Sequence, residues 1–79
     1  MHNNISDIIY FHRKCSGLTQ QELTELAGVG KNMVSELENG KLSVRLDNLL
    51  KIFQILNIGL DFKSPLRESY LKEREDAQR

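Results

Sequence analysis

The sequence predicts a small, all-α bundle of four to five helices, followed by one short β-strand. Apolar residues recur at helical spacing in four segments, and one segment near residue 60 alternates instead. A length of 79 residues, with 39% hydrophobic and 28% charged residues, fits a single globular domain.

The first helix is predicted over residues 5–15, with Ser16-Gly17 ending it. The side chains of one stripe should face the core: Ile5, Ile8, Ile9 and His12. Cys15, the one cysteine, cannot form an intramolecular disulfide, and we expect it to be a half-buried free thiol.

The second helix, residues 19–27, is predicted from its amino-terminal cap. Thr19 and Glu22 have the spacing of a capping box, in which each side chain bonds the backbone N–H of the other residue. Leu18 and Leu23 flank this cap at the spacing of a hydrophobic staple. The inward face should hold Leu23, Leu26 and Ala27.

A tight turn and a third helix follow. Gly28 stands where a helix end usually needs a left-handed residue. The third helix is predicted over 31–38, beginning at Gly30 or Lys31, and Asn39-Gly40 closes it. Two short helices joined in this way are typical of a helix-turn-helix, whose second helix can enter the DNA major groove.

The fourth helix is predicted over residues 45–57, after a loop at 40–44, and should form the main wall of the core. Its apolar positions are Leu46, Leu49, Leu50, Ile52, Phe53 and Leu56.

Residues 58–62 alternate apolar and polar positions, which predicts a strand. Its apolar face would consist of Ile58, Leu60 and Phe62. A lone strand leaves its backbone groups unpaired, so we expect it to pair with the same strand of a second copy across a two-fold axis. The alternatives are a fifth short helix or an extended tail.

The domain is predicted to end at this strand, giving residues 1–62 for DNA binding and dimerisation and 63–79 for a charged tail. Ser64-Pro65 is a plausible helix start. The tail is expected to be either a surface helix or a segment ordered by a partner.

Several classes of protein are not expected from this composition. No apolar run is long enough to span a membrane, and the amino terminus is unlike a secretory signal, so we expect a cytoplasmic protein. No residues have the spacing of a catalytic constellation or a metal site. We therefore expect no enzyme activity, no catalytic residues, no metal and no cofactor.

The charge balance is unusual for a nucleic-acid-binding protein, because 11 basic and 11 acidic residues give zero net charge. Affinity for DNA must then come from local placement of cations. Lys31, Lys41 and Arg45 lie at or after the ends of the third predicted helix.

Polar residues at the start of the third helix have the chemistry to read base edges. Asn32 suits adenine, Lys31 suits guanine or a phosphate, and one turn later Ser35 and Glu36 lie on the same surface. The amino end of the second helix, with Gln20, is placed to bond a phosphate. The alternative is a solvated polar face on a helical bundle.

The chain resembles the Xre/lambda-repressor-like helix-turn-helix family in the stretch LTQQELTELAGVGKNMVSELENGK, and more loosely from about residue 5 to residue 57. The resemblance implies a lambda-repressor-like bundle that binds DNA. It implies that four side chains face base edges: Lys31, Asn32, Ser35 and Glu36. Gln20 and Lys41 would contact phosphate, Gly30 would cap the third helix, and Arg13 would pair with Glu38 as a structural ion pair.

The stretch NGKLSVRLDNLLKIFQILNIGLDF is similar to the HipB-like branch of this family. That similarity implies a homodimeric repressor on a palindromic operator, acting as the antitoxin of a HipA-like kinase toxin. The alternatives are a phage-type repressor, a restriction–modification controller protein, or a protein-interaction module that does not bind DNA.

Overall fold

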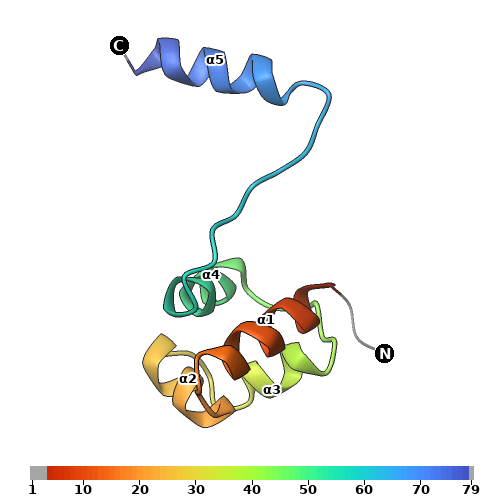
Figure 1. Cartoon of the computed structure of the whole chain (residues 1–79), viewed down its shortest axis with the longest axis vertical. Helices are drawn as coiled ribbons and strands as arrows, with labels where there is room; N and C mark the ends of the chain where they lie inside the picture. Colours follow the sequence, from red (N-terminus) through yellow and green to blue (C-terminus); the bar gives the residue numbers. More distant parts are fainter. Residues whose placement is uncertain (1–3, 79) are drawn as a thin grey trace.

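The computed structural model describes residues 4–78, which form five α-helices and, within that range, no β-strand. The helices are α1 (Asn4–Cys15), α2 (Gln20–Ala27), α3 (Met33–Glu38), α4 (Leu46–Ile55) and α5 (Arg67–Ala77). Helices α1 to α4 form a bundle, and an extended segment leads from α4 to α5, which lies apart from the bundle (Figure 1). The predicted all-helical bundle is confirmed, while residues 1–3 of the predicted domain and residue 79 of the predicted tail lie outside the described range.

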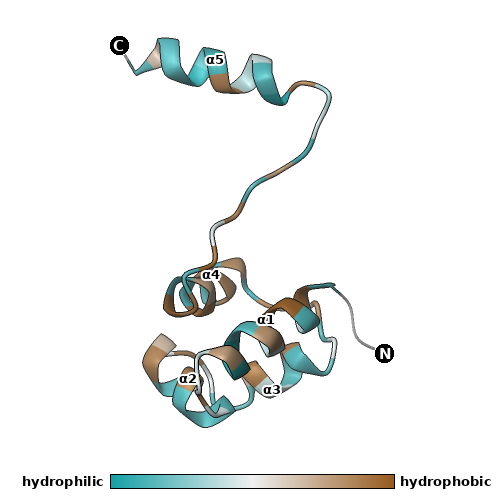
Figure 2. Ribbon diagram, viewed as in Figure 1, coloured by the Kyte–Doolittle hydropathy of each residue, from teal (hydrophilic) through white to brown (hydrophobic). Residues whose placement is uncertain are grey.

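The core lies between α1, α3 and the α2–α4 pair and contains apolar side chains from all four helices. Its buried members are Ile9, Leu23, Met33, Val34, Leu37, Leu49, Ile52, Phe53 and Leu56. Figure 2 shows hydrophobic residues along each of these four helices. Figure 2 also shows that α5 is mostly hydrophilic, and no residue of α5 is buried. No helix of the described chain is both long and apolar enough to span a membrane.

The predicted capping box is present at the start of α2. The Glu22 backbone N–H donates to Thr19 Oγ1 at 3.0 Å, and the Thr19 backbone N–H donates to Glu22 Oε1 at 2.9 Å. Hydrogen bonds from Thr19, first from its backbone N–H and then from its side chain, lower the pKa of the Glu22 carboxyl. At the other end Gly28, with φ at 68°, takes the left-handed conformation that closes the helix.

The third helix begins two residues later than predicted. Gly30 is not its cap, because Asn32 holds the N-cap position and makes no side-chain capping bond. The Met33 backbone N–H donates to the Gly30 carbonyl at 3.1 Å, so Lys31 and Asn32 form a turn ahead of the helix. This turn carries both side chains out of the bundle.

The predicted apolar stripes are wider than the surfaces that the neighbouring helices cover. Leu46 and Leu50 of α4 are 62% and 41% exposed, and Leu26 of α2 is 58% exposed. The neighbouring helices cover only one face of α4 and one face of α2, so these leucines lie toward solvent. Ile8 on α1 is 39% exposed for the same reason, and Cys15, at the carboxyl end of that helix, is exposed rather than half-buried.

The strand predicted at residues 58–62 is absent from the single chain. Asn57 has a φ of 58°, and the Ile58 N–H donates back to the Phe53 carbonyl at 2.8 Å, which ends α4. Ile58 packs against the core, but Leu60 and Phe62 are 63% and 43% exposed on an extended segment. A strand needs a partner, and a single chain supplies none here. The pairing between two copies stays a prediction.

Helix α5 begins after Ser64-Pro65, so the helical alternative for the tail is the one found. Arg67 donates to both carboxylate oxygens of Asp61, at 3.1 and 3.2 Å, and lies over the Phe62 ring. The Phe62 and Tyr70 rings meet edge to face at 5.5 Å. The backbone N–H of Phe62, and then Arg67, lower the pKa of Asp61. These contacts join α5 to the segment before it, away from the bundle.

Candidate nucleic-acid interface

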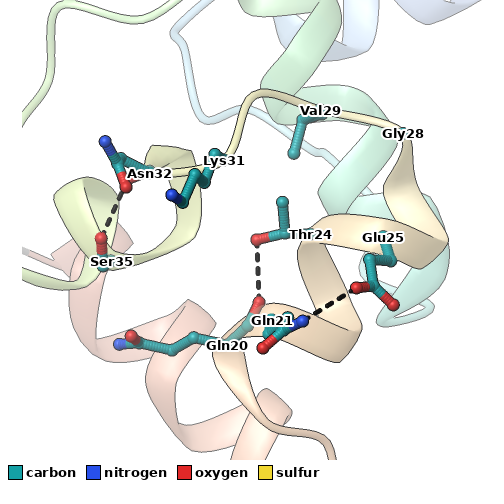
Figure 3. Close-up of a pocket in the computed structure, with 9 residues that line it drawn as sticks. All are labelled: Gln20, Gln21, Thr24, Glu25, Gly28, Val29, Lys31, Asn32 and Ser35. Carbon is teal, nitrogen blue, oxygen red and sulfur yellow. Dashed lines mark hydrogen bonds between the residues drawn. The ribbon is translucent and has the colours of Figure 1, made fainter.

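An open groove runs between α2 and the start of α3 (Figure 3). It is lined by Gln20, Gln21, Thr24, Glu25, Gly28, Val29, Lys31, Asn32 and Ser35. The groove brings together three polar residues predicted to contact base edges and the glutamine predicted to contact phosphate. Glu36 and Lys41 line the opposite side of α3.

The side chains of Lys31 and Asn32 are exposed at the mouth of this groove. The Asn32 amide makes no capping bond, so its donor and acceptor pair is available to a base edge. Ser35 is half-buried, and its hydroxyl donates to the Asn32 carbonyl at 3.0 Å, which leaves its oxygen able to accept. Because α3 starts late, the amide of Asn32, the ammonium of Lys31 and the hydroxyl of Ser35 lie close together at its amino end.

The opposite side of α3 has a second hollow, where two of the predicted cations, Lys41 and Arg45, are paired with carboxylates. It is lined by Gly30, Lys31, Asn32, Met33, Glu36, Lys41, Val44, Arg45 and Asn48. Lys41 Nζ lies 2.8 Å from Glu36 Oε2, and Arg45 Nη2 lies 3.0 Å from Asp47 Oδ2. The sequence pattern places the cations at this site but does not reveal these pairs.

Gln20 is held by the structural ion pair of the core. Arg13 donates from Nε to Glu38 Oε2 at 2.6 Å and from Nη2 to Glu38 Oε1 at 2.9 Å, as the resemblance implied. Gln20 Nε2 donates to the same Glu38 Oε1 at 3.1 Å. This bond uses one of the two amide hydrogens of Gln20 and leaves the second for an anion at the amino end of α2.

The buried pair also fixes the direction of the Arg13 side chain. Arg13 Nη1 donates to the Leu18 carbonyl at 2.8 Å, and its hydrogen bond to Glu38 is the main cause that raises the pKa of the guanidinium. Arg13 therefore stays charged at every practical pH. The contact between Gln20 and Glu38 was missed from sequence, because residues 18 positions apart show no periodic signal of contact.

Within residues 4–78, no group of three or more histidine, cysteine, aspartate or glutamate side chains lies close enough to hold a metal ion. The arrangement instead offers hydrogen-bond donors, acceptors and one ammonium on a protruding helix end, the groups that recognise a polar polymer such as DNA.

Comparison with known proteins agrees with this geometry. The model of the helix-turn-helix family matches residues 12–63, which is more than half of the chain. An uncharacterised HTH-type transcriptional regulator, y4mF, from Sinorhizobium fredii is 32% identical over 62 residues, covering 78% of this chain and 82% of that protein. The chain therefore belongs to the helix-turn-helix family.

Proposed function

We propose that this protein is a sequence-specific DNA-binding transcriptional regulator that reads the major groove with α3. The observation that carries the proposal is the exposed polar turn at the start of α3, with Lys31 and Asn32 at the edge of the α2–α3 groove. Membership of the helix-turn-helix family and similarity to a protein named as a transcriptional regulator support the same function.

In this proposal the side chains divide into two groups. Those that face base edges are Lys31, Asn32, Ser35 and Glu36, because they lie on or beside the protruding end of α3. Those that position the protein on the phosphate backbone are Gln20, Gly30, Lys41 and Arg45. Glycine at position 30 lets the backbone approach the duplex closely.

The regulator is proposed to act as a homodimer on a palindromic operator, with two α3 helices about 34 Å apart in successive major grooves. The extended segment 58–62 would pair with its twin through Ile58, Leu60 and Phe62. Its exposed apolar side chains support such an interface. Residues 1–62 would form the binding and dimerisation domain, and 63–79 a charged tail.

We further propose that the protein represses its own operon as an antitoxin of the HipB-like branch, by occluding polymerase, and that it binds a HipA-like kinase toxin. The support is the similarity of residues 39–62 to that branch. A protein-interaction module is the second candidate, and zero net charge is the observation that favours it. The two differ in one property: a DNA-binding protein loses affinity for a duplex steeply as salt rises.

The experiment is selection of bound sequences from a randomised duplex library, followed by gel-shift titration of the selected site and its single-base variants. Asn32→Ala should lower discrimination at one base pair by about 1–3 kcal/mol, because one bidentate contact contributes about that much. Gln54→Ala, an exposed amide on α4, is the matched control and should leave discrimination unchanged. Equal discrimination by wild type and Asn32→Ala would refute the assignment, and no salt-dependent binding at all would favour the interaction module.

A further inference from the structure

We infer that Glu36 and Asp47 limit binding of this protein to non-specific DNA, by holding the two cations that would otherwise reach phosphates. Lys41 is engaged by Glu36 at 2.8 Å, and Arg45 is engaged by Asp47 at 3.0 Å. The inference rests on the proposed DNA-binding function and assigns these carboxylates the role of limiting phosphate-driven binding at the same site.

The cations of both pairs, Lys41 and Arg45, share a hollow with Lys31 and Asn32, the turn that is proposed to meet the duplex. Glu36, Lys41 and Arg45 line one hollow beside α3, and Asp47 follows in the first turn of α4. The Lys41 and Glu36 side chains are 46% and 44% exposed, so these pairs are open to solvent and add little to stability. Lys31 borders the same hollow, and no ion pair engages it in the described part of the chain.

A cation already paired with a carboxylate contributes less to non-specific binding. Affinity for arbitrary duplex comes from neutralising phosphates and releasing their counterions. Lys41 must leave Glu36 to do this, and the carboxylate left behind then repels the same phosphates. A cognate site offsets this cost through base contacts, whereas an arbitrary sequence has none to offer. The carboxylates therefore hold down the affinity for arbitrary duplex, whose binding depends on phosphate contacts alone.

The test is a fluorescence-anisotropy titration of a random-sequence duplex with full-length protein at several NaCl concentrations. Glu36→Gln and Asp47→Asn should each bind this duplex more tightly than wild type. Each should also steepen the slope of log K against log salt by about 0.9. The ratio of its affinity to that of wild type should therefore shrink about 3.5-fold between 50 and 200 mM NaCl. Glu73→Gln makes the same charge change on α5, away from the bundle, and should not alter the slope.

A double-mutant cycle separates the pairing from a general charge effect. In a Lys41→Met background, Glu36→Gln should lose most of its effect, because no cation is released. Circular dichroism at the titration temperature verifies that each variant is folded. Two outcomes would overturn the inference while leaving the proposed function intact. One is a salt slope of Glu36→Gln equal to that of wild type or of Glu73→Gln. The other is that Glu36→Gln still tightens binding in the Lys41→Met background. If neither wild type nor variants bind any duplex at low salt, the proposed function fails and this inference with it.

Discussion

Removal of the Glu38 carboxylate should be the most damaging polar substitution in the bundle. Glu38→Ala leaves the Arg13 guanidinium, whose side chain is 9% exposed, without its two charged hydrogen bonds at 2.6 and 2.9 Å. It also removes the acceptor of Gln20. Breaking one side of a buried ion pair costs about 3–5 kcal/mol, because the remaining charge stays desolvated. A domain of 79 residues has a total stability of about 4–12 kcal/mol, so the variant should lose a large fraction of its stability.

Urea unfolding followed by circular dichroism measures this loss, provided that the slope with denaturant stays constant. Glu36→Ala is the matched control, because it breaks a carboxylate–cation pair of similar length on the surface and should cost less than about 1 kcal/mol. The double variant Arg13→Met/Glu38→Leu should recover much of the stability by replacing both charges with apolar side chains. If Glu38→Ala and Glu36→Ala lose the same small amount, the buried pair does not have the role assigned to it.

Three further outcomes test the remaining structure. The stability advantage of wild type over Glu22→Gln should be constant above the ordinary pKa of glutamate and should fall as the pH drops through the lowered folded-state pKa of Glu22. Melting temperatures of both proteins from pH 7 to pH 2 measure this advantage. A pH-independent difference would contradict the capping box with Thr19. Gly28→Ala should lower the free energy of unfolding by about 1–2 kcal/mol through its left-handed φ alone, because a Cβ there meets no atom within 4 Å, and Gly28→Asn should cost less. Ile52→Ala should lower the free energy of unfolding in urea by about 2–5 kcal/mol, and Leu46→Ala should lower it far less, because Ile52 is 0% and Leu46 is 62% exposed. Equal losses would contradict the packing of α4.

Local signals in the sequence were sufficient for the parts of the fold that depend on neighbouring residues. The cap formed by Thr19 and Glu22 and the left-handed Gly28 involve residues at most four apart, so their spacing alone predicts them. The inward face of α3 follows from periodicity in the same way. Among the candidate site residues, Lys31 and Asn32 are exposed as the helix-turn-helix pattern indicated.

Contacts between distant residues were decided by the tertiary structure. Leu46 and Leu50 fit the helical spacing of apolar residues as well as the buried residues of α4 do. They are exposed because α2 covers only part of the surface of α4. The placement of Gln20 against Glu38 depends on how α2 and α3 cross, which no spacing encodes.

The sequence by itself determined four amphipathic helices and both caps of α2, because these depend on short-range hydrogen bonds and on the spacing of apolar residues. Only the tertiary structure decided which apolar faces are covered, that Gln20 meets Glu38, and that residues 58–62 run extended without a partner strand. The physical reason is that burial and pairing depend on the surfaces that other segments of the chain supply. Residues 58–62 have the alternating pattern of a strand, but a strand forms only where another backbone takes its hydrogen bonds.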